Sequence, residues 1–221
     1  MELYNEIAGL ESDSYFINIK LDAYAEMKVL YLYKNIEINI PGRHNVLNTV
    51  VALAMANSYG VPLAIIAKAL KSFKGIQRRF NYKIKTNNLV LIDDYAHHPT
   101  ELKAFFDSLD LLYPEEKKTI IFQPHLFTRT QDFMDGFAEQ LSRVDHLILM
   151  PIYPARELPI EGVTSENLAK KIKTKVSVLN HKDALTLMER IDHKVIATVG
   201  AGDIDKLILP LSKILQNKTK G

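Results

Sequence analysis

The chain has 221 residues and no cysteine, which excludes disulfides and thiolate metal sites; its 47% hydrophobic and 24% charged residues suit one or two globular domains. A formal net charge of +2 does not fit the dense basic surface of a nucleic-acid-binding protein. The acidic, polar first residues are unlike a secretory signal, and no apolar run approaches the roughly 20 residues of a membrane helix, so we expect a cytoplasmic protein.

The first forty residues have the alternating pattern of β-strands. Polar and apolar side chains alternate, as they do in a half-buried strand, over residues 15–20, 28–33 and 36–40. The polar pair Lys34 and Asn35 separates the second segment from the third and predicts the turn of an antiparallel hairpin. Pro41 and Gly42 end this region.

Two helices are predicted next. Residues 45–59 are rich in Ala, Leu, Val and Met and apolar on nearly every face, so we expect this helix to be well buried, with Gly60 as its C-cap. A second helix follows Pro62 and covers residues 63–73. The polar, glycine-containing stretch 74–79 precedes a change in pattern, and we place a domain boundary there.

Strands and helices alternate regularly from residue 80 onward. Strands are expected at residues 80–85, 89–93, 119–122, 146–150, 176–179 and 195–199, and helices at 100–112, 131–143, 165–171, 182–190 and 203–215. This alternation predicts an α/β fold with a Rossmann-like, mostly parallel sheet that carries helices on both faces. Ligands of such sheets bind at the carboxyl ends of the strands, so residues that follow strands are the candidates for function.

Two polar clusters precede this regular region. Asn45 begins the first helix; helix capping is the simpler explanation, and the alternative is that its amide, which both donates and accepts hydrogen bonds, meets a planar base. Arg78 and Arg79 lie in the boundary stretch, where adjacent arginines are usually only solvated. An arginine at a hinge between domains can instead reach a phosphate chain and neutralise the charge of a transferring group.

The most informative stretch follows the apolar residues 89–92 and reads Asp93-Asp94-Tyr95-Ala96-His97-His98-Pro99. Two carboxylates and two imidazoles at a strand end are hard to explain by packing, because such groups are normally paired or solvated. A structural explanation is that Asp94 satisfies a turn and His98 precedes the helix that Pro99 begins. Metal ligation by Asp and His is a further alternative, which we rank below substrate contact because the sequence shows no third spaced ligand set.

Two more strand ends carry polar residues. In Phe122-Gln-Pro-His-Leu-Phe-Thr-Arg-Thr130, His125 and Arg129 lie four residues apart and either threonine can cap the following helix. An arginine beside a helix amino terminus favours a carboxylate or phosphate; a capping threonine with a surface arginine is the structural alternative. Residues 200–204 form a glycine turn without the lysine of a P-loop, and a tight turn with Asp203 as helix cap explains it best.

Several of these stretches, in this order, resemble the Mur ligases. The run PGRHNVLNTVVALAMA is similar to the helix of the family's central domain that meets the adenine of ATP, and FKGIQRRF is similar to the linker before the carboxy-terminal domain. DDYAHHPTEL and FQPHLFTRT are similar to signatures of the alanine-adding member. The resemblance covers residues 38–204, and the last two stretches form a specific pair.

The resemblance implies a three-domain enzyme of which this chain contains only a part. Residues 1–76 are expected to be the C-terminal remnant of the central, ATP-binding domain, and residues 77–221 the whole carboxy-terminal domain. The family's glycine-rich loop ends in Gly-Lys-Thr, and neither this triplet nor Gly-Lys-Ser occurs in the sequence. ATP and Mg²⁺ are therefore expected in the full-length enzyme and not on this fragment alone, whose expected partner is the missing N-terminal portion.

The implied reaction joins L-alanine to UDP-N-acetylmuramate in peptidoglycan biosynthesis. The γ-phosphoryl group of ATP moves to the muramyl carboxylate, and the alanine amine then attacks the acyl phosphate. The resemblance assigns Asn45, Asp94 and Arg79 to adenine, ribose and phosphates, and Tyr95, His97, His125 and Arg129 to the amino acid and the reacting groups. Arg129 is expected to hold the alanine carboxylate, and either His97 or His125 to accept the ammonium proton.

Two departures from the family pattern and two rival functions accompany this assignment. Leu126 replaces a residue that is basic in many relatives, and Arg156 replaces a frequent glycine.

A muropeptide ligase of cell-wall recycling shares the DD-F/Y-AHHPT stretch but not FQPHxFTRT, so free alanine is favoured over a tripeptide. A non-catalytic nucleotide-binding module is the other alternative, whereas a dehydrogenase is disfavoured because no complete G-x-G-x-x-G follows a strand.

Overall fold

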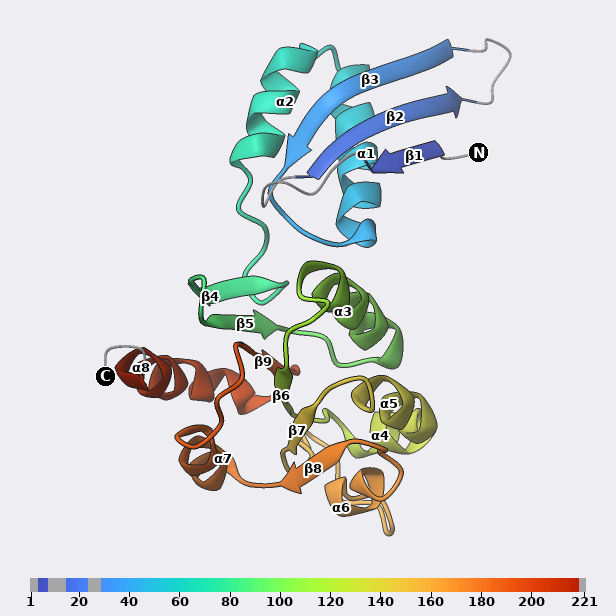
Figure 1. The fold of residues 1–221 in the computed structure, drawn as a ribbon. Helices are drawn as coiled ribbons and strands as arrows, with labels where there is room; N and C mark the ends of the chain where they lie inside the picture. The colour runs from blue at the N-terminus through green and yellow to red at the C-terminus, as the bar shows by residue number, and fades with distance from the viewer. Residues whose placement is uncertain (1–3, 8–14, 24–28, 219–221) are drawn as a thin grey trace. The chain divides into compact units, whose positions relative to one another are not determined.

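The computed structural model describes residues 4–7, 15–23 and 29–218, with side chains from Ile36 onward except that of Arg43. The chain divides into two compact units, residues 1–76 and residues 77–221 (Figure 1). Each unit has its own sheet, with three strands in the first and six in the second among the described residues. The division falls within the polar stretch where the sequence pattern changes.

The first unit is an antiparallel sheet followed by two helices. Its elements are β1 (Tyr4–Ile7), β2 (Tyr15–Ala23), β3 (Val29–Ile38), α1 (Arg43–Ser58) and α2 (Leu63–Ser72). The hairpin predicted at Lys34 and Asn35 is wrong, because β3 runs straight through them. Ile17 pairs with Ile36 and Ile19 with Tyr33, so the two polar residues oppose a single residue of β2 and form a β-bulge.

The expected deep burial of α1 is also wrong within the described part of the chain. Val46, Val50 and Leu53 are buried, whereas Val51 and Met55 are 59% and 58% exposed. A helix that is apolar on every face can be buried on all sides, but its burial requires a partner surface against each face. The helix ends as expected, because Gly60 adopts φ +81°, a left-handed conformation that follows many helices.

The second unit is an α/β sandwich around a six-stranded sheet in the order β4-β5-β9-β6-β7-β8 (Figure 1). Its elements are β4 (Asn81–Lys85), β5 (Val90–Asp94), α3 (Pro99–Leu112), β6 (Lys118–Phe122), α4 (Phe127–Asp132), α5 (Met134–Leu141), β7 (His146–Leu149), α6 (Ser165–Ala169), β8 (Lys175–Val178), α7 (His181–Met188), β9 (Val195–Val199), the 3-10 helix η1 (Asp203–Leu207) and α8 (Ile208–Lys218). Within the described strands of this sheet, β4 pairs antiparallel with β5, and all the other pairs are parallel. The predicted mostly parallel sheet is therefore confirmed.

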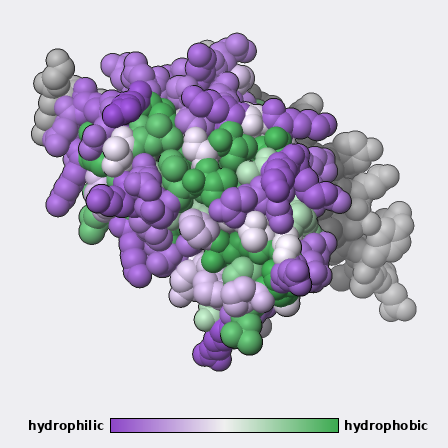
Figure 2. All heavy atoms as spheres, turned by 90° about the horizontal axis from the view of Figure 1, so that it is seen from below, coloured by the Kyte–Doolittle hydropathy of each residue, from purple (hydrophilic) through white to green (hydrophobic). Residues whose placement is uncertain are grey.

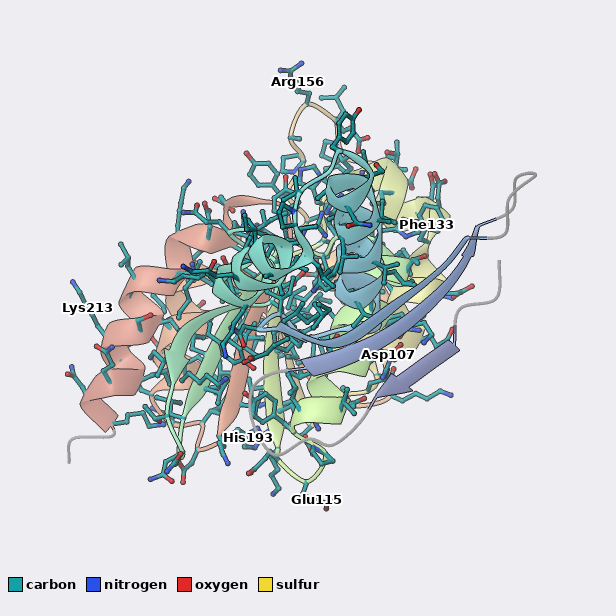
Figure 3. All side chains as sticks on the ribbon, turned by 90° about the horizontal axis from the view of Figure 1, so that it is seen from above. Asp107, Glu115, Phe133, Arg156, His193 and Lys213 are labelled. Atoms are coloured by element: carbon teal, nitrogen blue, oxygen red, sulfur yellow. The ribbon has the colours of Figure 1, made fainter. Side chains whose placement is uncertain are left out.

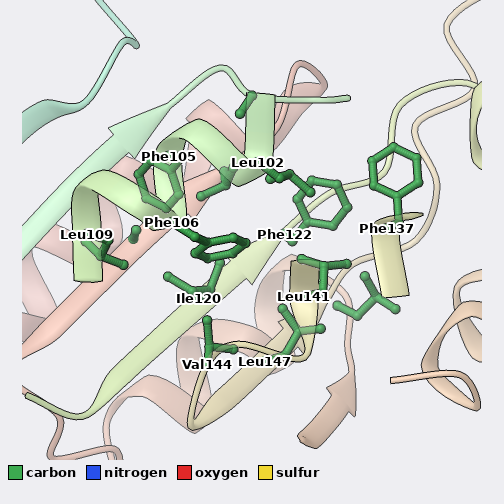
Figure 4. Close-up of a cluster of buried hydrophobic side chains, with 14 of the residues drawn as sticks. Leu102, Phe105, Phe106, Leu109, Ile120, Phe122, Phe137, Leu141, Val144 and Leu147 are labelled. Atoms are coloured by element: carbon green, nitrogen blue, oxygen red, sulfur yellow. The ribbon is translucent and has the colours of Figure 1, made fainter. Parts of the chain in front are cut away.

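Helices cover both faces of this sheet, each over its own apolar core. Successive strand residues point to opposite faces, so Ile120 packs with α3 and α5 while Ile121 packs with α7 and α8. Figure 4 shows the first core, where α3 side chains meet those of β6, α5 and β7. The residues of this contact are Leu102, Phe105, Phe106, Leu109, Ile120, Phe122, Phe137, Leu141 and Leu147. The buried strands read as continuous apolar runs because both faces are covered.

Two predicted helices are interrupted in the structure. The helix predicted over 131–143 overlaps the end of α4 and includes all of α5, and the two helices are separated at Phe133. Phe133 has φ −119° and ψ 22°, outside helical geometry, and its ring contacts that of His98 edge to face with centroids 4.5 Å apart. The segment predicted over 203–215 begins with the 3-10 helix η1 and continues as α8.

The outer surface of the second unit is mixed in polarity. Figure 2 shows one face of the molecule, on which apolar residues are surrounded by polar ones. The larger apolar side chains that stay exposed in the described part of this unit include Leu111, Phe133, Leu158 and Leu209. Such scattered exposed residues are ordinary for a folded domain.

Candidate functional site

The polar segments that follow β5, β6 and β9 meet at one edge of the sheet. β9 pairs with both β5 and β6, so the carboxyl ends of these three strands are neighbours. Figure 3 places Phe133 and Arg156, which follow β6 and β7, toward one end of the second unit and Glu115 and His193, which precede β6 and β9, toward the other. The first of these ends is the carboxyl-end edge, where ligands of such sheets bind.

Two imidazoles and an arginine gather at this edge. The rings of His97 and His125 lie 6.0 Å apart, and that of His97 is 5.2 Å from the ring of Tyr95. Nη1 of Arg129 lies 3.3 Å from Nδ1 of His125. The four residues that the sequence analysis assigned to the amino acid therefore form one cluster, although they come from two separate strand ends.

Tyr153 completes the cluster and was not predicted as a site residue. Its ring stacks on His125 with centroids 5.6 Å apart and an interplanar angle of 17°. Its backbone also pairs with that of His125, because Tyr153 N donates to Pro124 O at 2.8 Å and Leu126 N donates to Tyr153 O at 2.9 Å. The available signal was its position directly after β7, which follows the same rule as the other site residues.

Hydrogen bonds fix the state of both imidazoles. Nδ1 of His97 lies 2.8 Å from Tyr95 O, and because a carbonyl only accepts, this nitrogen carries the proton and Nε2 has the lone pair of the neutral ring. Nδ1 of His125 faces the Arg129 donor, so its proton is on Nε2. Burial, followed by the positive charge of Arg129 and by the neighbouring His97 imidazole, lowers the pKa of His125, while the carboxylate of Glu157 opposes them.

The carboxylate of Glu101 holds the backbone of His97 in place. The Glu101 carboxylate accepts from His97 N at 2.9 Å, and its other oxygen lies 3.6 Å from Nη1 of Arg79. His98, in contrast, is a helix cap, because its Nδ1 accepts from Thr100 N at 3.2 Å and Pro99 begins α3. The structural explanation of His98 is therefore confirmed.

The two aspartates at the end of β5 are buried. Asp93 is fully buried, lies 3.5 Å from Nε of Arg78 and accepts from the Thr198 hydroxyl at 3.2 Å. Asp94 is 6% exposed, and its carboxylate accepts from Phe80 N and Ala96 N, both at 2.7 Å. The bond to Ala96 confirms that Asp94 satisfies the turn after β5.

The linker arginine Arg78 is part of the second unit and not a solvated side chain. Its Nη2 donates to Gly200 O at 2.6 Å, its guanidinium lies 4.9 Å from the Tyr95 ring centroid, and Tyr95 N donates to its carbonyl at 2.7 Å. Arg78 and Phe80 adopt φ +57° and +47°, which is uncommon for residues with a side chain. These contacts tie the start of the unit to the candidate site. Arg79 remains 48% exposed.

The Asp94 carboxyl makes the stability of the second unit depend on pH. Burial raises its pKa from 3.8 to about 6, against two backbone hydrogen bonds that lower it. Because folding raises this pKa, the native state is favoured at low pH, where the carboxyl is protonated. This contribution to the free energy of unfolding, about 3 kcal/mol, is lost as pH rises from about 4 through 6. We expect Asp94→Asn to reduce the slope of unfolding free energy against pH in this window, measured by urea titration; an unchanged slope would contradict the burial.

The glycine turn after β9 is locked to β6 by Gln123. A Cβ on Gly200 would lie 2.7 Å from Gln123 O, and one on Gly202 would lie 2.3 Å from Gln123 Oε1, so both positions require glycine. Oε1 also accepts from Ile204 N at 2.9 Å. The predicted tight turn is confirmed, but Asp203 does not cap the helix; its carboxylate accepts from Gln123 Nε2 at 2.9 Å instead.

The threonines after β6 do not cap α4 either. Thr130 donates to Leu126 O at 2.8 Å, and the Thr128 hydroxyl donates to Glu157.

Asn45, the predicted site residue of the first unit, lies inside α1 and not at its cap, which is Gly42. Its amide donates to Pro41 O at 2.6 Å.

Within residues 4–7, 15–23 and 29–218, no group of three or more His, Cys, Asp or Glu side chains is arranged to hold a metal ion. In the same part of the chain, no helix is both long enough and apolar enough to cross a membrane.

Comparison with known proteins gives one consistent family. A family profile described as "Mur ligase, glutamate ligase domain" matches residues 78–208. A curated UDP-N-acetylmuramate–L-alanine ligase from Flavobacterium psychrophilum is 49% identical over 186 residues, which cover 84% of this chain and 42% of that protein. The one from Cytophaga hutchinsonii is 46% identical over 187 residues, covering 84% of this chain and 40% of that protein. These alignments are longer than the second unit, so they extend into the first.

Solved structures agree with this. The UDP-N-acetylmuramate–alanine ligase of Thermotoga maritima has a TM-score of 0.72 and 25% identity, with 93% of this chain and 44% of that one covered. The murein peptide ligase of Psychrobacter arcticus has a TM-score of 0.63 at 22% identity, covering 96% of this chain and 44% of that one, and shares the fold. The chain spans about two fifths of the length of the curated relatives it matches. The profile match and these alignments show that the chain belongs to the Mur ligase family.

Proposed function

We propose that this chain is the carboxy-terminal part of an ATP-dependent ligase that joins L-alanine to UDP-N-acetylmuramate in peptidoglycan synthesis. The observation that carries the proposal is the cluster of His97, His125 and Arg129 at the carboxyl edge of the sheet. The relatives named above as UDP-N-acetylmuramate–L-alanine ligases support the same substrates. ATP supplies the phosphoryl group that converts the muramyl carboxylate into an acyl phosphate.

Arg129 holds the carboxylate of L-alanine in this proposal. A guanidinium presents two parallel donors that match the two oxygens of a carboxylate. Arg129 is half-buried, and its only described hydrogen-bond contact is the long one of 3.3 Å to His125. Its donor capacity is thus largely available to a ligand. The ring of His125, which stacks on that of Tyr153, lies beside Arg129, and in this proposal the two rings limit the site to a small amino acid.

The tautomers divide the catalytic work between the two histidines. His97 has its lone pair on Nε2, so it is the residue that accepts the proton of the alanine ammonium group and frees the amine for attack. His125 carries its proton on Nε2 and is suited to donate to an oxygen of the acyl phosphate. Tyr95 lines the same region through its edge contact with His97.

The nucleotide is assigned to residues of both units. Asn45 contacts adenine, Arg79 the phosphates and Asp94 the ribose. The half-exposed Arg79, whose Nη1 lies 3.6 Å from the Glu101 carboxylate, fits its role. Asp94 fits less fully, because each of its oxygens already accepts a backbone hydrogen bond and only the remaining lone pairs can receive ribose hydroxyls. Mg²⁺ is held by the phosphates and the P-loop portion, which this sequence does not contain.

The first unit is the C-terminal part of the ATP-binding domain, and its helices pack against the N-terminal portion of the enzyme. Apolar side chains that a finished core would bury are exposed on α1, α2 and the residues after them. They are Val51, Met55, Tyr59, Ile65, Phe73 and Ile76. So large an exposed apolar set within one small unit indicates a covering partner. The curated relatives contain more than half of their length outside the matched region.

The direct test compares this chain with a fusion enzyme, in which the N-terminal portion of the Flavobacterium psychrophilum relative precedes it. We expect the fusion enzyme to release phosphate from ATP only when both UDP-N-acetylmuramate and L-alanine are present. The 221-residue chain alone should release none, because it lacks the phosphate-binding loop. Release by the chain alone, or a preference of the fusion enzyme for a tripeptide over L-alanine, would contradict the proposal.

A further inference from the structure

The segment after β7 reaches across to the segment that carries both His125 and Arg129. Its first anchor is Tyr153, which pairs with His125 through the backbone and through stacked rings. Its second anchor is Glu157, whose carboxylate accepts from Thr128 N at 3.0 Å and from the Thr128 hydroxyl. Two anchors four residues apart thus hold the loop before α4 and the first turn of α4.

The hydrogen bonds of Glu157 also fix the start of α4. Thr128 is the neighbour of Arg129 in the sequence, so a bond to its backbone fixes the turn from which the arginine projects. Neither α4 nor Leu126 before it supplies a side-chain cap, and Leu126 adopts φ +74°. The carboxylate therefore stabilises a helix start that the local sequence does not stabilise by itself.

The charge of Glu157 also acts on the site. Hydrogen bonds from the Thr128 hydroxyl and backbone lower the pKa of Glu157, so the side chain is an anion at neutral pH. Among the described residues, the titratable groups that influence the His125 imidazole are Arg129 on α4, His97 on the segment after β5 and Glu157 on the segment after β7. Of these three, only Glu157 favours the protonated imidazole.

We propose that Glu157 is a positioning residue of the amino-acid site, which fixes Arg129 and His125 by tying the segment after β7 to the first turn of α4. The inference rests on the proposed function for the identity of the ligand, but not for the contact itself. Glu157 does not touch the reacting atoms; it acts through Thr128 and through its charge.

The contact is tested first on the 221-residue chain, by following the imidazole carbon signals with NMR as pH is varied. Glu157→Gln removes the anion but keeps an oxygen acceptor, so the titration midpoint of His125 should move to lower pH. His125→Gln identifies the signal. Glu161→Gln, a loss of the same charge at an exposed position of the same segment, is the control and should leave the midpoint in place. An unchanged midpoint in Glu157→Gln overturns the proposal.

The role in the amino-acid site is tested in the fusion enzyme. Glu157→Ala should raise the KM for L-alanine about tenfold and leave that for ATP within about twofold, because only the amino-acid half of the site loses its support. Thr128→Val, which keeps the backbone donor, should have a smaller effect. A shifted His125 midpoint with an unchanged KM for L-alanine would overturn the positioning role. If the unsubstituted fusion enzyme makes no product, the proposed function fails, while the NMR result still decides the contact.

Discussion

Replacing Arg129 with alanine in the fusion enzyme should raise the KM for L-alanine about a hundredfold and leave the KM for ATP within about twofold. In the proposed site, the half-buried Arg129 guanidinium, beside His125, is the group assigned to pair with the amino-acid carboxylate through two hydrogen bonds. Without it, the carboxylate must leave water without the charged donors that replace its lost solvation. Steady-state kinetics with each substrate varied in turn measures both constants.

Two matched variants sharpen this test. Arg129→Lys keeps the charge but loses the paired donors, and we expect an intermediate rise in the KM for L-alanine. Arg156→Ala removes an arginine from the loop tip that projects in Figure 3 and should change neither constant. An equal loss for ATP and L-alanine in Arg129→Ala would place the arginine on the phosphates and reject its assignment.

Replacing Arg78 with methionine should destabilise the second unit by about 3–5 kcal/mol. Asp93 is fully buried, and burial raises its pKa although Arg78 and Lys83 oppose the shift. Removing the closer cation leaves a buried carboxylate whose remaining ion-pair partner in the described chain is Lys83, at 4.0 Å. Methionine retains much of the packing of the arginine stem, so the loss reports the charge and the bond to Gly200.

The loss of stability caused by the Arg78 substitution should depend on pH. Removal of Arg78 raises the pKa of Asp93 further, and a raised pKa means that stability is lost as pH rises. The variant should therefore lose more stability at pH 8 than at pH 5, as measured by urea unfolding of the 221-residue chain. Arg78→Met combined with Asp93→Asn should recover part of the loss, and Arg79→Met, at a half-exposed position, should cost less than about 1 kcal/mol. A pH-independent loss would show that packing and not charge holds the linker.

Much of the second unit follows from its sequence pattern. Continuous apolar runs such as 89–92 and 195–199 identified strands that are buried on both faces. The same reasoning failed in the first unit, where Lys34 and Asn35 form a bulge, because a polar pair interrupts alternation equally in a turn and in a bulge. The separation of α4 from α5 also escaped prediction, because neither glycine nor proline marks the break at Phe133.

The candidate site was predictable where its residues directly follow strands. His97, His125 and Arg129 were found because carboxyl ends of parallel strands meet at one edge. The structural roles of Asp93 and Asp94 in binding the linker were not predicted. The linker returns to β5 through the positive φ angles of Arg78 and Phe80, and no glycine in the sequence signals those angles. Contacts across segments, such as that of Glu157 with Thr128, leave no periodic trace in a single sequence.

A crystal structure of the fusion enzyme with L-alanine and a non-hydrolysable ATP analogue tests the assignment of the amino-acid site most directly. The amino-acid carboxylate should lie within hydrogen-bonding distance of the Arg129 guanidinium, with the amine directed toward Nε2 of His97. Electron density for the amino acid at any other surface, with that arginine left unliganded, would contradict the assignment.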